Sequence, residues 1–199
     1  ASERGWQLSL GLSRLEALSG NNVQRIGLSA TVGNPQQVAK WLSSDGEAII
    51  ETGKRITEIV VETAFPETID ETGGIEYAIP ARAHAIFRDI IEIIRKDSPC
   101  LLFVNSRSDA ETIANRLQKM APDLEIGVHH GSLATETRVE MEDGLRSGKV
   151  SGLVCTSSLE LGIDIGLINR IIQIKSPRSV DRLLQRVGRA DHRLGGIGR

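Results

Sequence analysis

Apolar positions recur along the chain with two alternating periods. From residue 81 onward, a three-to-four residue spacing predicts helices over 81–96, 108–120, 135–147 and 179–188. Between them, short apolar runs predict strands over 100–104, 124–128, 151–155 and 170–174. The run Leu101–Val104 has no polar interruption, which is typical of a strand covered on both faces. The alternation predicts an α/β fold, a parallel sheet flanked by helices.

The first eighty residues follow a different pattern. Leucines at three-to-four spacing predict a helix over 4–19, and an apolar run predicts a strand over 23–28. Asn34 and Pro35 supply an N-cap and a first-turn proline for a helix that reaches Leu42. Two β-rich runs follow at 48–51 and 56–62. Residues 63–80 show little periodicity and contain two prolines and two adjacent glycines, so we place the main domain boundary there.

Composition narrows the class of protein. The 199 residues are 40% hydrophobic and 25% charged, and no apolar run approaches the roughly 20 residues of a membrane-spanning helix. The first residues lack the features of a secretory signal, so we expect a cytoplasmic protein without a membrane partner. A net charge of −2 and 3% aromatic residues argue against a static, high-affinity nucleic-acid-binding module. Neither the two cysteines nor His129-His130 has metal-ligand spacing, so no metal site is predicted.

Four polar segments follow the predicted strands, at the edge where open parallel sheets bind ligands. They are rich in hydroxyls, small residues and a few cations, which suits phosphate oxygens. Polar loops and helix caps have a similar composition, but four such segments on one edge favour a binding site. The segments are Asn105-Ser106-Arg107, His129-His130-Gly131-Ser132, Thr156-Ser157-Ser158 and Ser176-Pro177-Arg178-Ser179.

Two further segments carry charge. Asp164 lies just past Gly162 in an apolar setting, where it either caps a turn or faces a ligand. The stretch Gln185–Arg193 holds three arginines and a histidine near a predicted helix end. These arginines either complement the helix dipole or stabilise a transferring phosphoryl group.

Five segments together resemble motifs III, IV, IVa, V and VI of superfamily 2 nucleic-acid helicases, in that order. They are Ser29-Ala30-Thr31, Phe103–Arg107, His129–Leu133, Thr156–Asp164 and Gln185–Arg189. The last two are most similar to the large helicase-related (Lhr) family. The resemblance implies the C-terminal segment of a first RecA-like domain over 1–52, a linker or edge segment over 53–80, and a second RecA-like motor domain over 81–199.

The resemblance also implies roles for individual residues. Ser29, Ala30 and Thr31 would couple ATP hydrolysis to movement. Arg189 is the expected arginine finger, with Arg186 and Gln185 as its catalytic neighbours, and Gly162, Asp164, Arg186 and Arg189 would face the nucleotide. The residues expected to hold a single nucleic-acid strand are Ser106, Arg107, His130, Gly131, Thr156 and Ser157. Asp191 replaces the usual glycine of the last motif, and His192 occupies the place of a second arginine.

A working helicase also needs a phosphate-binding loop and an acidic pair for magnesium. Neither motif occurs in the 199 residues. We therefore expect half of an ATP site, completed by Mg²⁺ and a first RecA-like domain with a phosphate loop, and no cofactor bound tightly to this chain. The leading hypothesis is an intracellular, nucleoid-associated 3′ to 5′ helicase acting on single-stranded DNA, RNA or DNA·RNA hybrid. The alternatives are a non-enzymatic RecA-like module that binds nucleic acid or protein, and an unrelated doubly wound metabolic enzyme.

Overall fold

The computed structural model describes residues 3–21, 23–28, 34–43, 49–50, 65–160 and 165–190, with the backbone alone of 58–59 and 197–198. The chain divides into two compact units, residues 1–54 and 55–199. The functional division at 52 and 80 that the motifs imply remains a prediction. No helix in these described ranges is long and apolar enough to cross a membrane.

The described residues of the first unit form two helices, α1 (Glu3–Ser19) and α2 (Pro35–Leu42), at the predicted positions. The Asn34 side chain caps α2 by accepting a hydrogen bond from the backbone N–H of Gln37 at 3.0 Å. The strand predicted over 23–28 is wrong, because these residues form neither strand nor helix. Two of their apolar side chains are also exposed, Ile26 at 73% and Leu28 at 94%. Residues 49–50, inside a predicted β-rich run, form no strand either.

The second unit is built on a four-stranded parallel sheet, which confirms the predicted fold class. Its strands run in the order β3-β4-β2-β5. Their bounds are β2 (Cys100–Phe103), β3 (Ile126–His129), β4 (Gly152–Cys155) and β5 (Arg170–Gln173). All four were predicted, with ends shifted by one or two residues. A separate parallel pair joins β1 (Glu58–Ile59), inside the predicted run 56–62, to β6 (Ile197–Gly198).

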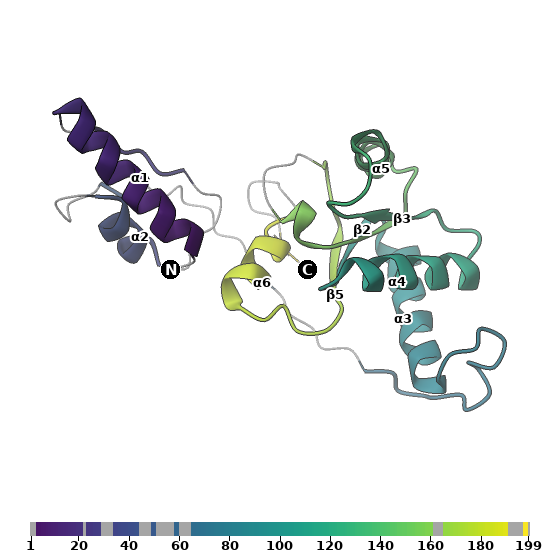
Figure 1. Ribbon diagram of the computed structural model, residues 1–199. Helices are drawn as coiled ribbons and strands as arrows, with labels where there is room; N and C mark the ends of the chain where they lie inside the picture. Colours follow the sequence, from purple (N-terminus) through teal and green to yellow (C-terminus); the bar gives the residue numbers. More distant parts are fainter. Residues whose placement is uncertain are drawn as a thin grey trace. The chain divides into compact units, whose positions relative to one another are not determined.

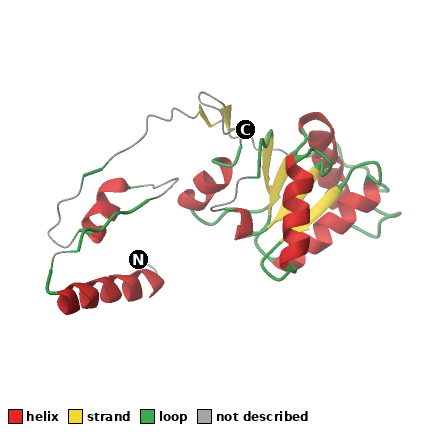
Figure 2. Ribbon diagram, turned by 90° about the horizontal axis from the view of Figure 1, so that it is seen from above, coloured by secondary structure: helices red, strands yellow, loops and turns green. Residues whose placement is uncertain are grey.

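Helices cover both faces of this sheet, as Figures 1 and 2 show. Cys100 and Leu102 of β2 point into one core, shared with α3 (Ala81–Asp97) and α4 (Arg107–Met120). Leu101 and Phe103 point into the opposite core, shared with Leu145 of α5 (Thr135–Arg146). The alternation follows from the two-residue period of a strand, and both cores explain why the strands read as unbroken apolar runs. The helices are α3 (Ala81–Asp97), α4 (Arg107–Met120), α5 (Thr135–Arg146) and α6 (Val180–Val187), with a short 3₁₀ turn η1 (Ser157–Leu159) after β4.

The segment directly before α3 packs partly against the second unit's core. It forms turns over residues 71–78, and Ile79 is buried against the α3/α4 core with Tyr77 packed beside it. Gly74 is required here because a Cβ would lie 2.0 Å from the carbonyl oxygen of Ile79.

The thiols of Cys100 and Cys155 are free and buried, and burial raises the pKa of both. Both behave as core residues.

Candidate nucleic-acid and nucleotide site

The four polar segments lie along one edge of the sheet. The register aligns His129 with Cys155, Cys155 with Phe103, and Phe103 with Gln173, so the four strands end at the same level. The segments that follow them are therefore neighbours in space, although they are spread over 75 residues of sequence, from Asn105 to Ser179. This is the edge at which the sequence predicted ligand binding.

Three of the segments enclose a pocket of about 520 Å³, named here the hydroxyl pocket. Its lining includes five of the six residues predicted to bind nucleic acid: Ser106, Arg107, Gly131, Thr156 and Ser157. Asn105 and Ser158 also line it. The carboxamide oxygen of Asn105 is buried with no hydrogen-bond partner among the described residues, while its nitrogen donates to the carbonyl of Ser176 at 3.0 Å. The pocket combines hydroxyls, one exposed guanidinium and backbone amides, a set of groups suited to phosphate.

The start of α4 places two of these residues. Ser106 is the N-cap, and its hydroxyl accepts from the backbone N–H of Asp109 at 3.0 Å. Arg107 is then the first helical residue and is exposed. Helix N-termini carry partial positive charge, which adds to that of Arg107. The negative charge of the Asp109 carboxylate reduces this positive potential. Lys175 offsets that charge, because its ammonium nitrogen lies 3.1 Å from the carboxylate, and the contact lowers the pKa of Asp109.

The sixth predicted residue, His130, does not line the hydroxyl pocket. Its ring is 2% exposed, and its Nε2 contacts Glu111 at 3.1 Å. The Ser132 backbone N–H donates to its Nδ1 at 3.3 Å. His130 thus stabilises the loop after β3, and a direct contact with nucleic acid remains a prediction.

His129 forms a buried network that sequence reasoning missed. Its Nδ1 lies 2.8 Å from the Ser158 hydroxyl, and its Nε2 lies 2.9 Å from a Glu142 carboxylate oxygen. Burial lowers the pKa of His129, although Glu142 acts in the opposite direction. We therefore infer a neutral ring that donates through Nε2–H to Glu142, beside a Ser158 hydroxyl that donates to the backbone carbonyl of His129 at 3.1 Å. No local signal marks this network, because its members are 13 and 29 positions apart.

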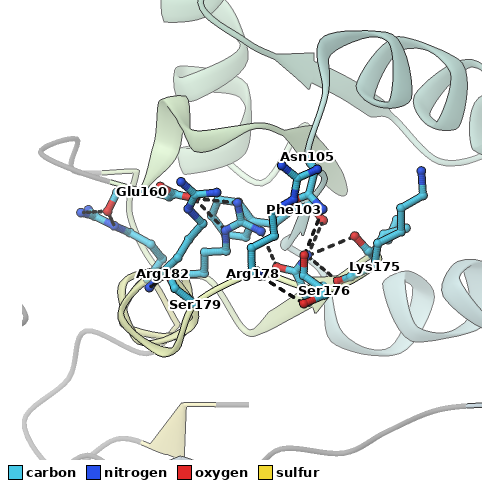
Figure 3. Close-up of polar contacts among 12 residues, drawn as sticks. Phe103, Asn105, Glu160, Lys175, Ser176, Arg178, Ser179 and Arg182 are labelled. Atoms are coloured by element: carbon cyan, nitrogen blue, oxygen red, sulfur yellow. Dashed lines mark hydrogen bonds and ion pairs between the residues drawn. The ribbon is translucent and has the colours of Figure 1, made fainter. Parts of the chain in front are cut away.

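Further along the same edge lies an arginine cluster, formed by Arg186, Arg189, Glu160, Gln173 and Phe103. Figure 3 labels Glu160 and Phe103 of this cluster. Arg186 is 1% exposed and lies over the Phe103 ring, with its guanidinium carbon 4.9 Å from the ring centroid. Its Nε and Nη2 donate to one Glu160 carboxylate oxygen at 2.8 and 2.6 Å, and its Nη1 donates to the Gln173 side chain at 2.6 Å.

Arg189, the predicted finger, is half-buried just past the end of α6. Its Nε and Nη2 both donate to the backbone carbonyl of Glu160, at 3.2 and 2.8 Å, and burial lowers its pKa. Gln185 is half-buried on α6. The other predicted site residues, Gly162 and Asp164 at the nucleotide and Ser29, Ala30 and Thr31 for coupling, lie outside the described residues.

A larger hollow, of about 780 Å³, runs along α5 and is a poorer candidate. Its lining includes Glu136, Glu140 and Asp143, whose charges would repel phosphate. The chemistry therefore favours the smaller hydroxyl pocket.

Comparison with known proteins gives concordant matches. Residues 85–195 match the family described as helicase conserved C-terminal domain. The chain is 39% identical over its whole length to the ATP-dependent helicase Lhr-Core protein 2 of Thermococcus barophilus, and 35% identical over 99% of its length to the Lhr helicase/probable uracil glycosylase of Mycolicibacterium smegmatis. It spans only 23% and 15% of those two proteins.

Solved structures agree. The structure of Mycobacterium smegmatis helicase Lhr bound to ssDNA and AMP-PNP matches all of this chain at 35% identity with a TM-score of 0.77, and the chain covers 26% of it. The DUF1998 helicase MrfA bound to DNA and AMPPNP matches 94% of the chain with a TM-score of 0.64, and the chain covers 26% of that structure. The identity of this second match is 24%, so it supports the fold alone.

Proposed function

The chain belongs to the helicase conserved C-terminal domain family of Lhr-like superfamily 2 helicases, and on that premise we propose that it is the second motor domain of an ATP-dependent translocase moving 3′ to 5′ along nucleic acid. One observation carries the proposal. A hydroxyl-lined pocket and a half-buried arginine lie on the same edge of one sheet, joined by Glu160. That arrangement suits a protein that handles a phosphate chain and a nucleotide together.

In this proposal the hydroxyl pocket binds the backbone of single-stranded DNA or RNA, or one strand of a DNA·RNA hybrid. Ser106, Thr156 and Ser157 offer hydroxyl donors to phosphate oxygens, and Arg107 supplies the positive charge. None of these groups reads base edges, so binding should depend little on sequence. The similar M. smegmatis helicase, solved with ssDNA, supports this assignment.

The arginine cluster supplies the second domain's part of an ATP site. Arg189 fits a triphosphate because its fork is permanently charged and partly removed from water, where charge interactions are stronger. Arg186 and Gln185 would support it, with Gly162 and Asp164 beside the nucleotide. ATP with Mg²⁺ supplies the free energy for movement. The phosphate loop and the magnesium carboxylates must come from a first RecA-like domain.

The proposal predicts that the 199-residue chain alone hydrolyses no ATP. ATP turnover should be measured for the chain, for the first motor domain, and for the two mixed, each with and without single-stranded DNA or RNA. We expect turnover only in the mixture, stimulated by nucleic acid. If the mixture stays inactive while the chain still binds nucleic acid, the non-enzymatic binding module is the better assignment.

A further inference from the structure

Glu160 joins the two halves of the candidate site. It directly follows η1, whose first two residues line the hydroxyl pocket, and its backbone N–H donates to the Ser157 carbonyl at 3.1 Å. It is only 7% exposed, although it carries a carboxylate. A buried carboxylate next to a binding pocket needs a compensating partner. The partners of the Glu160 carboxylate are Arg182 and Arg186, both on α6.

The side chain and the main chain of Glu160 bind different arginines. Its carboxylate accepts two hydrogen bonds from Arg186, with the Arg182 Nε 3.6 Å away. Its backbone carbonyl accepts the two hydrogen bonds from Arg189. Figure 3 labels Glu160 and Arg182 and draws dashed polar contacts around Glu160. The position of this one residue therefore affects the guanidiniums of both Arg186 and Arg189.

The segment that connects the hydroxyl pocket to Glu160 is short and held at both ends. Only η1, a single 3₁₀ turn, separates Thr156 from Glu160, and Leu159 within it is buried in the α5-side core. The other end is also held, because Arg186 lies between Glu160, Gln173 and the Phe103 ring. Since packed interiors shift between discrete arrangements and do not stretch, a displacement of Ser157 should move the carbonyl that holds Arg189.

We propose, building on the function proposed above, that Glu160 is a positioning residue that couples occupation of the hydroxyl pocket to the orientation of Arg189. Its carboxylate anchors η1 to α6 through Arg186, and its carbonyl sets the plane of the Arg189 guanidinium. Glu160 itself touches neither nucleic acid nor nucleotide. A residue that only stabilised the fold would lower turnover by lowering the fraction of folded protein. A positioning residue lowers stimulated turnover even when the protein stays folded.

The test uses the complete protein with Glu160→Gln, which keeps the carbonyl and the side-chain size but removes the charge. ATP turnover is measured against single-stranded DNA concentration, and DNA affinity is measured separately without nucleotide. We expect maximal stimulated turnover to fall by about 10- to 100-fold, since displacement of a catalytic group by about 1 Å costs up to that range. DNA affinity and the concentration giving half-maximal stimulation should stay unchanged, and Glu160→Asp should recover part of the turnover.

Two controls separate positioning from folding. Asp97→Asn breaks another carboxylate–arginine pair, with Arg170 at 2.6 Å, at the opposite ends of the strands. It should lower thermal stability without lowering stimulated turnover at a temperature where the protein stays folded. The double variant Glu160→Gln with Arg186→Met removes the unpaired buried charge, so it should regain stability. Turnover should stay low, because the anchor from η1 to α6 is missing and Arg186, which is proposed to support Arg189, is lost as well.

Near-normal stimulated turnover in Glu160→Gln would overturn the positioning role, and so would full recovery of turnover in the double variant. An equal loss of turnover in Asp97→Asn would reassign the effect to stability and also overturn it. These results differ from a failure of the proposed function. In that case the unmodified protein itself would show no nucleic-acid-stimulated ATP hydrolysis.

Discussion

The hydroxyl pocket and the arginine cluster lie on one edge of the same sheet, yet they are built in opposite ways. Ser106, Arg107 and Ser157 are exposed, and Arg107 has an unhindered approach from solvent. Arg186 and Glu160 are buried and hold each other through two hydrogen bonds. A ligand that must slide through a site needs exposed, adaptable contacts. A reacting phosphoryl group needs charges fixed in advance in a low-dielectric setting.

The largest expected effect tests the arginine cluster. Arg189→Ala in the complete protein should reduce ATP turnover by roughly 10³-fold or more, the range measured for arginine fingers. Binding of single-stranded DNA without nucleotide should be unchanged, because Arg189 does not line the hydroxyl pocket. Arg88→Ala, which removes an exposed arginine of α3, is the charge-matched control. Near-normal turnover in Arg189→Ala would remove it from the nucleotide site.

The next largest effect is on the free energy of unfolding, and it compares the arginine cluster with the hydroxyl pocket. Arg186→Met leaves the Glu160 carboxylate buried without its main partner, which should lower the free energy of unfolding by about 3–5 kcal/mol. Arg107→Met removes an exposed charge, so the change should stay within about 0.5 kcal/mol. Urea unfolding of both variants measures the difference. Equal losses would contradict the contrast between a fixed and an adaptable region.

A smaller effect concerns His129, whose ring contacts Ser158 in the lining of the hydroxyl pocket. Its pKa is lowered in the folded protein from an ordinary value of 6.5, so the unfolded chain binds a proton more readily than the folded one. Stability is therefore complete above about pH 6.5 and falls as the pH drops below it, by at most about 1.4 kcal/mol per pH unit for this one group.

Urea unfolding at pH 7 and pH 5.5 measures this dependence. His129→Gln should flatten it between those values, although the variant itself is less stable because Gln cannot reproduce both hydrogen bonds. His130→Gln is the matched control, because it replaces the adjacent buried histidine and leaves the contacts of His129 with Ser158 and Glu142 in place. A pH dependence that persists unchanged in His129→Gln would assign the titration to another group.

The smallest effect tests the hydroxyl pocket itself. Arg107→Ala should weaken single-stranded DNA binding at every sequence and lower the slope of log affinity against log salt by about one, as expected for one lost phosphate contact. ATP turnover at saturating DNA should be little affected. Fluorescence anisotropy at several salt concentrations provides the measurement. An unchanged slope would exclude Arg107 from phosphate contact.

Much of the second unit could be predicted from the sequence. The four strands and the helices between them follow from local apolar spacing, and they appear close to their expected positions. The strand over 23–28 was wrong because apolar content alone does not form a strand. Its backbone must also pair with a neighbour, and the described residues of the first unit provide none.

The candidate site was predicted only in part for the same reason. Motif order indicated Arg189, just past the end of α6, and five residues of the hydroxyl pocket, which follow the ends of strands. It did not indicate that His130 is turned inward, or that Arg186 is tied to a carboxylate 26 positions away. Those facts depend on which loops the parallel sheet brings together.

By itself, the sequence determined the α/β class, the order of the elements and the residue types available at the carboxyl edge of the sheet, because these depend on spacing between near neighbours in the chain. Only the tertiary structure decided which polar groups face solvent and which neutralise one another. The links from Glu160 to Arg186 and Arg189, and from His129 to Glu142 and Ser158, exist because parallel strands place distant segments side by side, and burial then leaves each charge or polar group in need of a partner.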